Sequence, residues 1–340
     1  MPSRNRVRDV RRHENAVFMT GLCNSPMLFG YRRDRKRIRE MEQFVLPQVL
    51  FYAIMHVKNT EHILWMLYKG KEKRMFERVE LKQLNDHIWL MDDQHEATGY
   101  IVAGSDRALI IDTMMGFENV SAIAKTVTDK PLTVINTHGH CDHIFGNVWF
   151  DEALLDERDM ELAAEHSAMP EFVQACEEYS LRMPPFRAVK EGDTIDLGSL
   201  TAEIISLPGH TPGSLCVLIR EDRILFTGDG INRHLWMQLE ESLPLKQLLC
   251  NLDRAAALVK GRADRILHGH AQGFEDISLL DRLREGVRQL VEQQGTAVSD
   301  ADAEYDWFGG KALQHVFDEN SVIVYTRDKL PREEKQNERE

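Results

Sequence analysis

The chain has 340 residues, 43% hydrophobic and 29% charged, which is the composition of a soluble globular protein with a sizeable core. Its formal net charge of −13 disfavours nucleic acid and anionic membrane surfaces as partners. The five cysteines are widely spaced and form no C-x-x-C motif, which argues against a disulfide framework and favours a reducing, cytoplasmic location.

The charge is unevenly distributed along the chain. Residues 1–74 carry 16 Lys and Arg against 7 Asp and Glu, a net charge of +9, whereas residues 75–340 carry 26 against 48, a net of −22. We therefore predict a basic N-terminal extension of uncertain order, residues 1–74, and a main domain, residues 75–340. The extension allows several interpretations: a docking arm, a nucleic-acid-binding tail, a membrane-surface helix, or sequence upstream of a working start at Met75.

No signal peptide or transmembrane segment is expected. The basic start is not followed by an apolar segment with a small-residue cleavage site. The most apolar run, residues 45–57, is too short to cross a bilayer.

From Val79 onward, hydrophobic periodicity predicts regular elements. Alternating apolar residues on either side of Asn85-Asp86 predict a β-hairpin, and a similar pattern surrounds residues 104–106. In chain order we expect strands at 79–84, 87–91, 99–103 and 107–112, a helix at 119–129, a strand at 132–136, a mainly helical segment at 151–182, strands at 200–207, 215–219 and 224–226, a helix at 244–259, a strand at 265–267, a helix at 275–294 and a strand at 321–325. Strands in two groups, each followed by helices, predict an α/β protein with two packed sheets and helices outside, a four-layer αββα arrangement.

The most informative motif follows the predicted strand at 132–136. Within six residues the chain places three imidazoles and one carboxylate, in the order His138, His140, Asp142 and His143. Imidazole nitrogen and carboxylate oxygen are the usual protein ligands of Zn²⁺ and related ions. A merely His-rich polar turn is the alternative, but this density of ligand types favours a metal site.

Three more candidate ligands follow predicted strands, and each lies next to a glycine that lets the backbone turn sharply. They are His210 in Pro-Gly-His-Thr-Pro-Gly, Asp229 in Thr-Gly-Asp-Gly, and one of the two histidines in His268-Gly-His270. Any one of them alone is better explained as a turn or buried polar residue. Four strand-end loops of the same design favour a shared site.

This set of residues resembles the metallo-beta-lactamase superfamily, in its dinuclear hydrolase branch that includes glyoxalase II and lactonases. The resemblance spans about residues 77–275. It implies an αββα sandwich whose catalytic domain holds two divalent metal ions at one edge, with zinc expected and iron or manganese as alternatives. It also implies the ligand roles: His138, His140 and His210 for one metal, Asp142, His143 and His270 for the second, and Asp229 bridging both.

The resemblance implies further roles near the metals. His270 is preferred over His268 because the last ligand of the family follows glycine directly, and Asp112 occupies the place of an aspartate that orients a ligand. The expected catalytic carboxylates are Asp142 and Asp229. Cys141, amid the ligands, is interpreted as an incidental small side chain.

The expected reaction is hydrolysis of a small carboxyl derivative, an ester, thioester or lactone, by a hydroxide bridging the metals. Asp229 argues against classical beta-lactamase activity, because those relatives lack a carboxylate there, and Asn232 stands where lactonases carry tyrosine. The alternative is a mononuclear iron persulfide dioxygenase of the same fold, which keeps the same seven positions. We expect a small-molecule substrate and no nucleic-acid partner, and the sequence does not indicate an oligomeric state. Asn232, His234 and Trp236 are the candidate substrate contacts.

Overall fold

The computed structural model describes residues 78–292, 303–307 and 310–331. The predicted extension at residues 1–74 and the domain boundary near Met75 lie outside the described residues, so both stay predictions. Among the described residues, no helix combines the length and the apolar character needed to cross a membrane.

The first sheet has seven strands that pair in sequence order. The strands β1 to β4 pair antiparallel, and β4 to β7 pair parallel. The β1–β2 hairpin closes where predicted, because the Asn85 side chain accepts the N–H groups of His87 and Ile88. The strands are β1 (Val79–Gln83), β2 (Ile88–Asp93), β3 (Ala97–Ala103), β4 (Ala108–Ile111), β5 (Leu132–Ile135), β6 (Ala153–Asp156) and β7 (Phe186–Val189).

The second sheet has six strands in the order β14-β13-β11-β10-β9-β8. Its central strands β10 and β11 are buried along their whole length, as expected for strands covered on both faces. Within this sheet only β11 and β13 pair parallel, so the carboxyl ends of these two strands lie at the same edge of the sheet. The strands are β8 (Thr194–Asp196), β9 (Thr201–Ser206), β10 (Leu215–Ile219), β11 (Ile224–Gly228), β13 (Arg265–His268) and β14 (Glu275–Asp276).

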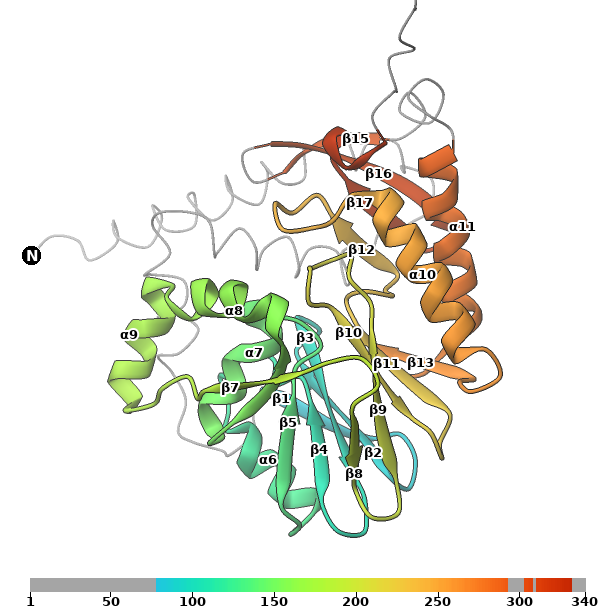
Figure 1. The fold of residues 1–340 in the computed structure, drawn as a ribbon. Helices are drawn as coiled ribbons and strands as arrows, with labels where there is room; N and C mark the ends of the chain where they lie inside the picture. The colour runs from blue at the N-terminus through green and yellow to red at the C-terminus, as the bar shows by residue number, and fades with distance from the viewer. Residues whose placement is uncertain (1–77, 293–302, 308–309, 332–340) are drawn as a thin grey trace, which may run out of the picture. The chain divides into compact units, whose positions relative to one another are not determined.

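The two sheets pack face to face with helices outside, which confirms the predicted four-layer arrangement (Figure 1). Ile111 and Ile135 of the first sheet share one buried core with Val217 and Phe226 of the second. The helix α6 (Val120–Val127) covers the outer face of the first sheet. The helices α10 (Leu245–Val259) and α11 (Ser278–Glu292) cover the outer face of the second.

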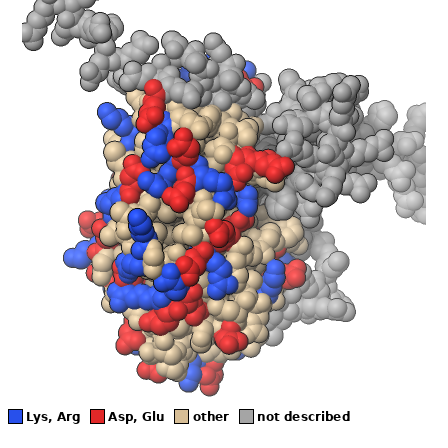
Figure 2. All heavy atoms as spheres, turned by 90° about the vertical axis from the view of Figure 1, so that its right-hand side faces the viewer, with Lys and Arg blue, Asp and Glu red and all other residues tan. Residues whose placement is uncertain are grey.

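Helix α10 shows why these segments become helices. Its buried residues recur every three or four positions and so form one apolar stripe: Leu245, Leu248, Leu252, Ala255 and Val259. The surface beyond α10 and α11 mixes acidic and basic side chains rather than separating them (Figure 2). Arg284 and Arg288 of α11, for example, both pair with Asp253 of α10. Exposed pairs contribute at most about 1 kcal/mol each, so the buried stripe dominates the packing of these helices.

A third sheet extends the second half of the molecule and was not predicted as a unit. It has the order β12-β17-β16-β15, with β12 (His234–Met237) pairing parallel to β17 (Ser321–Tyr325). The other two strands are β15 (Ala303–Trp307) and β16 (Gly310–Asp318). Helix α11 packs closely on this sheet, because a side chain on Gly286 would lie 2.4 Å from Phe317 Cβ.

The segment at residues 151–182 departs from its helical prediction at its start. Residues 153–156 form β6, buried between β5 and β7, and the helices begin later as α8 (Met160–Ser167) and α9 (Pro170–Tyr179). Pro170 lies at the first turn of α9, where its missing N–H costs nothing. The predicted helix at 275–294 likewise starts only at Ser278, because Glu275 and Asp276 pair with β13.

Candidate metal centre

Four loops meet at one edge of the two sheets, and each follows a strand. The loop after β5 carries His138, His140, Asp142 and His143, the last three being the N-cap and residues of the short helix α7 (Cys141–Ile144). The other three loops follow β9, β11 and β13 and carry His210, Asp229 and His270 in turn. The backbone joins the two sheets here, because Leu215 N–H donates to the Thr137 carbonyl.

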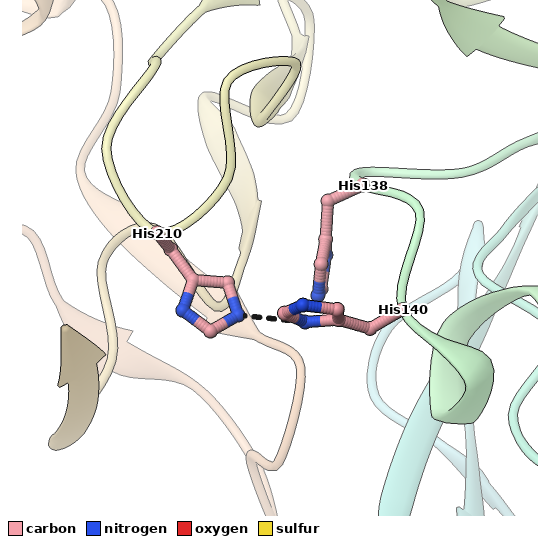
Figure 3. A group of neighbouring side chains, drawn as sticks. All are labelled: His138, His140 and His210. Carbon is pink, nitrogen blue, oxygen red and sulfur yellow. Dashed lines mark hydrogen bonds between the residues drawn. The ribbon is translucent and has the colours of Figure 1, made fainter. Parts of the chain in front are cut away.

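Three imidazoles form the first group, and they come from loops of different sheets. His138 and His140 point toward His210, and His210 points back at them (Figure 3). His210 Nε2 lies 3.0 Å from His140 Nδ1. One ring nitrogen from each of the three residues lies within 4.8 Å of those of the others.

Hydrogen bonds to the outer nitrogens orient these rings. The Thr137 hydroxyl donates to Asp112 Oδ2, so its oxygen is left to accept from His138 Nδ1, 3.0 Å away. His210 Nδ1 lies 2.7 Å from the Trp236 carbonyl, which can only accept. These partners assign the proton to Nδ1 of both rings. The lone pair of each Nε2 is therefore directed into the group, where a bound cation would accept it.

The second group contains Asp142, His143 and His270. Asp142 Oδ2 lies 3.5 Å from His143 Nε2 and 3.7 Å from His270 Nε2. His143 Nδ1 is held by Asp112 Oδ2 at 2.9 Å, so its Nε2 also faces inward with a lone pair. The geometry thus repeats that of the first group with a carboxylate in place of one imidazole.

Asp229 lies between the two groups. Its Oδ1 is 3.8 Å from His143 Nε2, and its Oδ2 is 3.1 Å from His270 Nε2 and 3.9 Å from His210 Nε2. One carboxylate therefore presents its two oxygens to both clusters. A further set of close ligand atoms, from His138, His143 and Asp229, links the groups directly.

The donor set fits divalent metal ions. Among the described residues, His138 Nε2, His143 Nε2 and His270 Nδ1 are buried and lack a hydrogen-bond partner. A buried polar atom without a partner costs about 1–3 kcal/mol, and a bound cation would remove that cost at the first two nitrogens, which face the groups. Carboxylate oxygens and imidazole nitrogens are the donors that zinc and similar ions take.

The electrostatics of the site favour the ligand forms of three of these groups, His138, His210 and Asp229. Burial, reinforced by His143 and His140, holds the pKa of His138 well below its usual value. Burial likewise lowers the pKa of His210 to about 4. Burial alone would raise the pKa of Asp229, but its interactions with the neighbouring His270 and His143 rings hold it well below its usual range. Neutral imidazole and ionised carboxylate are the forms that bind metal.

Asp112 contacts the predicted ligand His143, as the resemblance implied, and it also holds the first loop in place. It adopts a left-handed backbone conformation, with φ of 58°, and is 1% exposed. Its Oδ1 accepts the Thr137 N–H at 2.7 Å, while its Oδ2 serves Thr137 Oγ1 and His143. A strained residue fixed by several bonds next to the site is typical of a functional position.

Asp159 is a supporting residue that sequence reasoning missed. It is fully buried, and its carboxylate accepts the Gly139 N–H at 2.9 Å and the Thr211 hydroxyl at 2.6 Å. It also accepts the Gly213 N–H, so it ties the loop of His138 and His140 to the loop of His210. The two glycines allow this approach, because a Cβ on Gly213 would lie 2.6 Å from Asp159 Cγ.

The predicted substrate residues lie beside this centre, on the chain that follows Asp229. The Asn232 side chain donates to Asp229 Oδ1 at 3.3 Å. His234 and Trp236 are half-buried in β12, and burial lowers the pKa of His234 to about 4. His268 stays outside the three ligand groups, and its Nδ1 accepts the His270 N–H at 3.3 Å. Contact of these side chains with a substrate stays a prediction.

Known proteins resemble this chain in sequence and fold. The model of the metallo-beta-lactamase superfamily matches residues 94–270, just over half of the chain. The acyl-coenzyme A thioesterase MBLAC2 of Bos taurus is 24% identical over 229 residues, which cover 57% of this chain and 81% of the relative. Hydroxyacylglutathione hydrolase of Hyphomonas neptunium is 30% identical over 138 residues, which cover 39% of this chain and 47% of the relative. A solved metallo-beta-lactamase from Erythrobacter litoralis has a TM-score of 0.50 and 19% identity, covering 64% of this chain and 100% of that chain, and so shares the fold.

Proposed function

The chain belongs to the metallo-beta-lactamase superfamily and is a hydrolase of that fold, and we propose that it cleaves a small carboxyl derivative, with a thioester as the preferred substrate class. The observation that carries this proposal is the convergence of seven imidazole and carboxylate groups from four loops. Among the described residues, the buried Nε2 atoms of His138 and His143 have no hydrogen-bond partner.

We assign the ligands as the sequence predicts. His138, His140 and His210 would hold one divalent ion, and Asp142, His143 and His270 the other. Asp229 faces both groups and would be shared between them. When bound, such ions lower the pKa of a water molecule to about 7 and polarise the carbonyl that is to be cleaved.

The residues of this chain supply position and charge for that chemistry. Asp112 and the Trp236 carbonyl keep His143 and His210 oriented before any substrate arrives. Asp142 and Asp229 place negative charge in the site. Burial alone would raise the pKa of Asp142, but His143 and His270 together lower it to about 2. A site organised in advance needs little rearrangement as charge develops on the substrate.

The thioester is favoured by the relative matched over most of its length. This chain covers 81% of an acyl-coenzyme A thioesterase, and the match includes more than half of this chain. The segment at residues 232–237, which includes β12, is the proposed substrate wall, because it follows closely after Asp229 and carries half-buried His234 and Trp236. These two rings offer polar and apolar contacts beside the metals.

A substrate panel tests the proposal. Acyl-coenzyme A and acyl-glutathione thioesters, a lactone, a phosphodiester and a beta-lactam would be assayed on protein of measured metal content. We expect the highest kcat/KM with a thioester, and loss of that activity on chelation. Preference for the lactone would reject the thioester class. One iron per chain, with oxygen uptake on a glutathione persulfide, would identify the dioxygenase instead.

A further inference from the structure

A short segment between β12 and α10 places a carboxylate against one of the proposed ligands. Glu241 Oε1 lies 2.6 Å from His140 Nε2. Glu241 belongs to none of the three ligand groups, and its motif has no ligand signature. Because a carboxylate accepts, the proton of the neutral ring is at Nε2, and the lone pair at Nδ1 faces His210 Nε2 at 3.0 Å.

The same segment is fastened to the loop that carries His210. The Ser242 hydroxyl donates to the His210 carbonyl at 2.8 Å, and the Leu243 N–H donates to the Gly209 carbonyl at 2.8 Å. On its other side, Trp236 of β12 accepts from His210 Nδ1. Residues 236–243 therefore touch two of the three imidazoles of the first group.

A lysine from the end of the described chain holds this segment from behind. Lys329 Nζ donates to the carbonyls of Ser242, at 2.6 Å, and Glu240, at 3.2 Å, which flank Glu241. Lys329 is only 7% exposed, and burying its ammonium group costs free energy. The two hydrogen bonds offset part of that cost. Lys329 lies outside the matched residues 94–270, next to strand β17.

From this geometry we propose that Glu241 is a positioning residue for the metal site, which selects the His140 tautomer with Nδ1 free, and that Lys329 anchors the segment that carries it. The inference rests on the proposed metal-binding role of His140. It also gives the third sheet a function. Strand β12 carries the carbonyl that accepts from His210, and Lys329, after β17, holds the segment that carries the acceptor for His140.

The expected cost of losing Glu241 follows from its place behind a ligand. Without the carboxylate, the His140 ring can adopt the other tautomer or rotate, and its Nδ1 becomes a weaker metal ligand. Removing such a partner typically weakens metal binding by about 10–100-fold. Glu241→Gln keeps an acceptor oxygen and loses only the charge, so its metal binding should weaken less than that of a variant without the acceptor.

Cobalt binding measures this directly, because the visible absorption of bound Co²⁺ reports the geometry of its ligands. Full-length protein, stripped of metal by a chelator, would be titrated with Co²⁺. For Glu241→Ala we expect about 10–100-fold weaker binding and a changed absorption band. Glu241→Gln should lie between this variant and the unchanged protein, and Lys329→Met should shift binding in the same direction as Glu241→Ala.

The matched control is Glu240→Ala, which removes an exposed carboxylate one residue away and keeps the backbone carbonyl bound by Lys329. It should bind Co²⁺ like the unchanged protein. Unchanged affinity and absorption in Glu241→Ala would overturn the inference. If that variant does not fold, the same result in Glu241→Gln overturns it. If the unchanged protein binds no Co²⁺, the proposed metal function itself fails, which is a different outcome.

Discussion

Side chains at the site divide into those that face the shared centre and those that hold them there. All seven residues predicted as ligands lie at the centre, because their residue types and strand-end positions are visible in a short stretch of sequence. Asp159 and Glu241 were not predicted. Their partners lie 20–101 residues away, and no local pattern distinguishes a buried supporting carboxylate from a surface one.

Substitution of Asp229 tests the shared carboxylate. Asp229→Ala removes a carboxylate that faces both clusters, so we expect loss of about one bound metal ion and a drop in turnover greater than the ~10–100-fold cost of losing an outer hydrogen-bond partner. Metal content and steady-state rates measure this, with circular dichroism to check the fold. Full activity in Asp229→Ala would refute the bridging role.

The buried thiol of Cys216 predicts how the free energy of unfolding depends on pH. It lies in β10, and burial raises its pKa to about 12. The unfolded thiol ionises near pH 8.5, so between about pH 9 and 12 the folded state holds one more proton and stability falls as pH rises, by up to about 1.4 kcal/mol per pH unit. Cys216→Ala should remove that part of the slope.

Denaturant unfolding at several alkaline pH values measures this slope. Cys250→Ala is the matched control, because Cys250 is exposed on α10 and its removal should leave the slope unchanged. An identical slope in Cys216→Ala and the unchanged protein would contradict the assignment of a protonated buried thiol.

At the scale of elements, the loops owe their geometry to close backbone contacts. A Cβ on Gly213 would lie 2.6 Å from Asp159 Cγ, so Gly213→Ala must push apart the loops of His140 and His210. We expect a loss of about 1–3 kcal/mol in unfolding free energy and weaker metal binding. Gly273→Ala is the control, since the nearest atom there is the end of Lys82 at 4.0 Å.

Thermal unfolding and metal titration of the two glycine variants separate the outcomes. Equal stability and equal affinity in both would show that the contact between Gly213 and Asp159 does not set the loop geometry.

Elements with clear periodicity were predicted well, and short ones were not. The strands of the two hairpins and helix α10 match their predicted ranges to within about two residues. The four-residue strand β6 was predicted as helix, because a short apolar run between acidic residues fits either structure and only its neighbours β5 and β7 decide. Strand β12 was not predicted, since its partner β17 lies far along the chain.

At the scale of the whole molecule, the order of strands and helices was enough to predict two sheets with helices outside. The third sheet was not predictable in the same way, because its parallel pair joins residues 234–237 to residues 322–325 across two helices. Long-range pairings of this kind leave no local signal. The consequence for the site is direct, since this sheet carries the Trp236 carbonyl that orients His210.

The predicted division of the chain near Met75 can be tested at this scale. A protein that begins at Met75 should fold and keep its metals, because the ligand loops and the two sheets are built from later residues. Metal content and thermal unfolding of this shorter chain, compared with the full one, measure this. Failure to fold would show that the basic segment belongs to the main domain.

The central claim is that the seven clustered side chains bind divalent metal ions on which hydrolysis depends. Its most direct test is metal titration of the chelator-treated protein with activity followed in parallel. We predict about two Zn²⁺ bound per chain, with thioester hydrolysis absent before metal is added and restored as the ions bind. Failure to bind any divalent ion, or hydrolysis that persists without metal, would contradict the account.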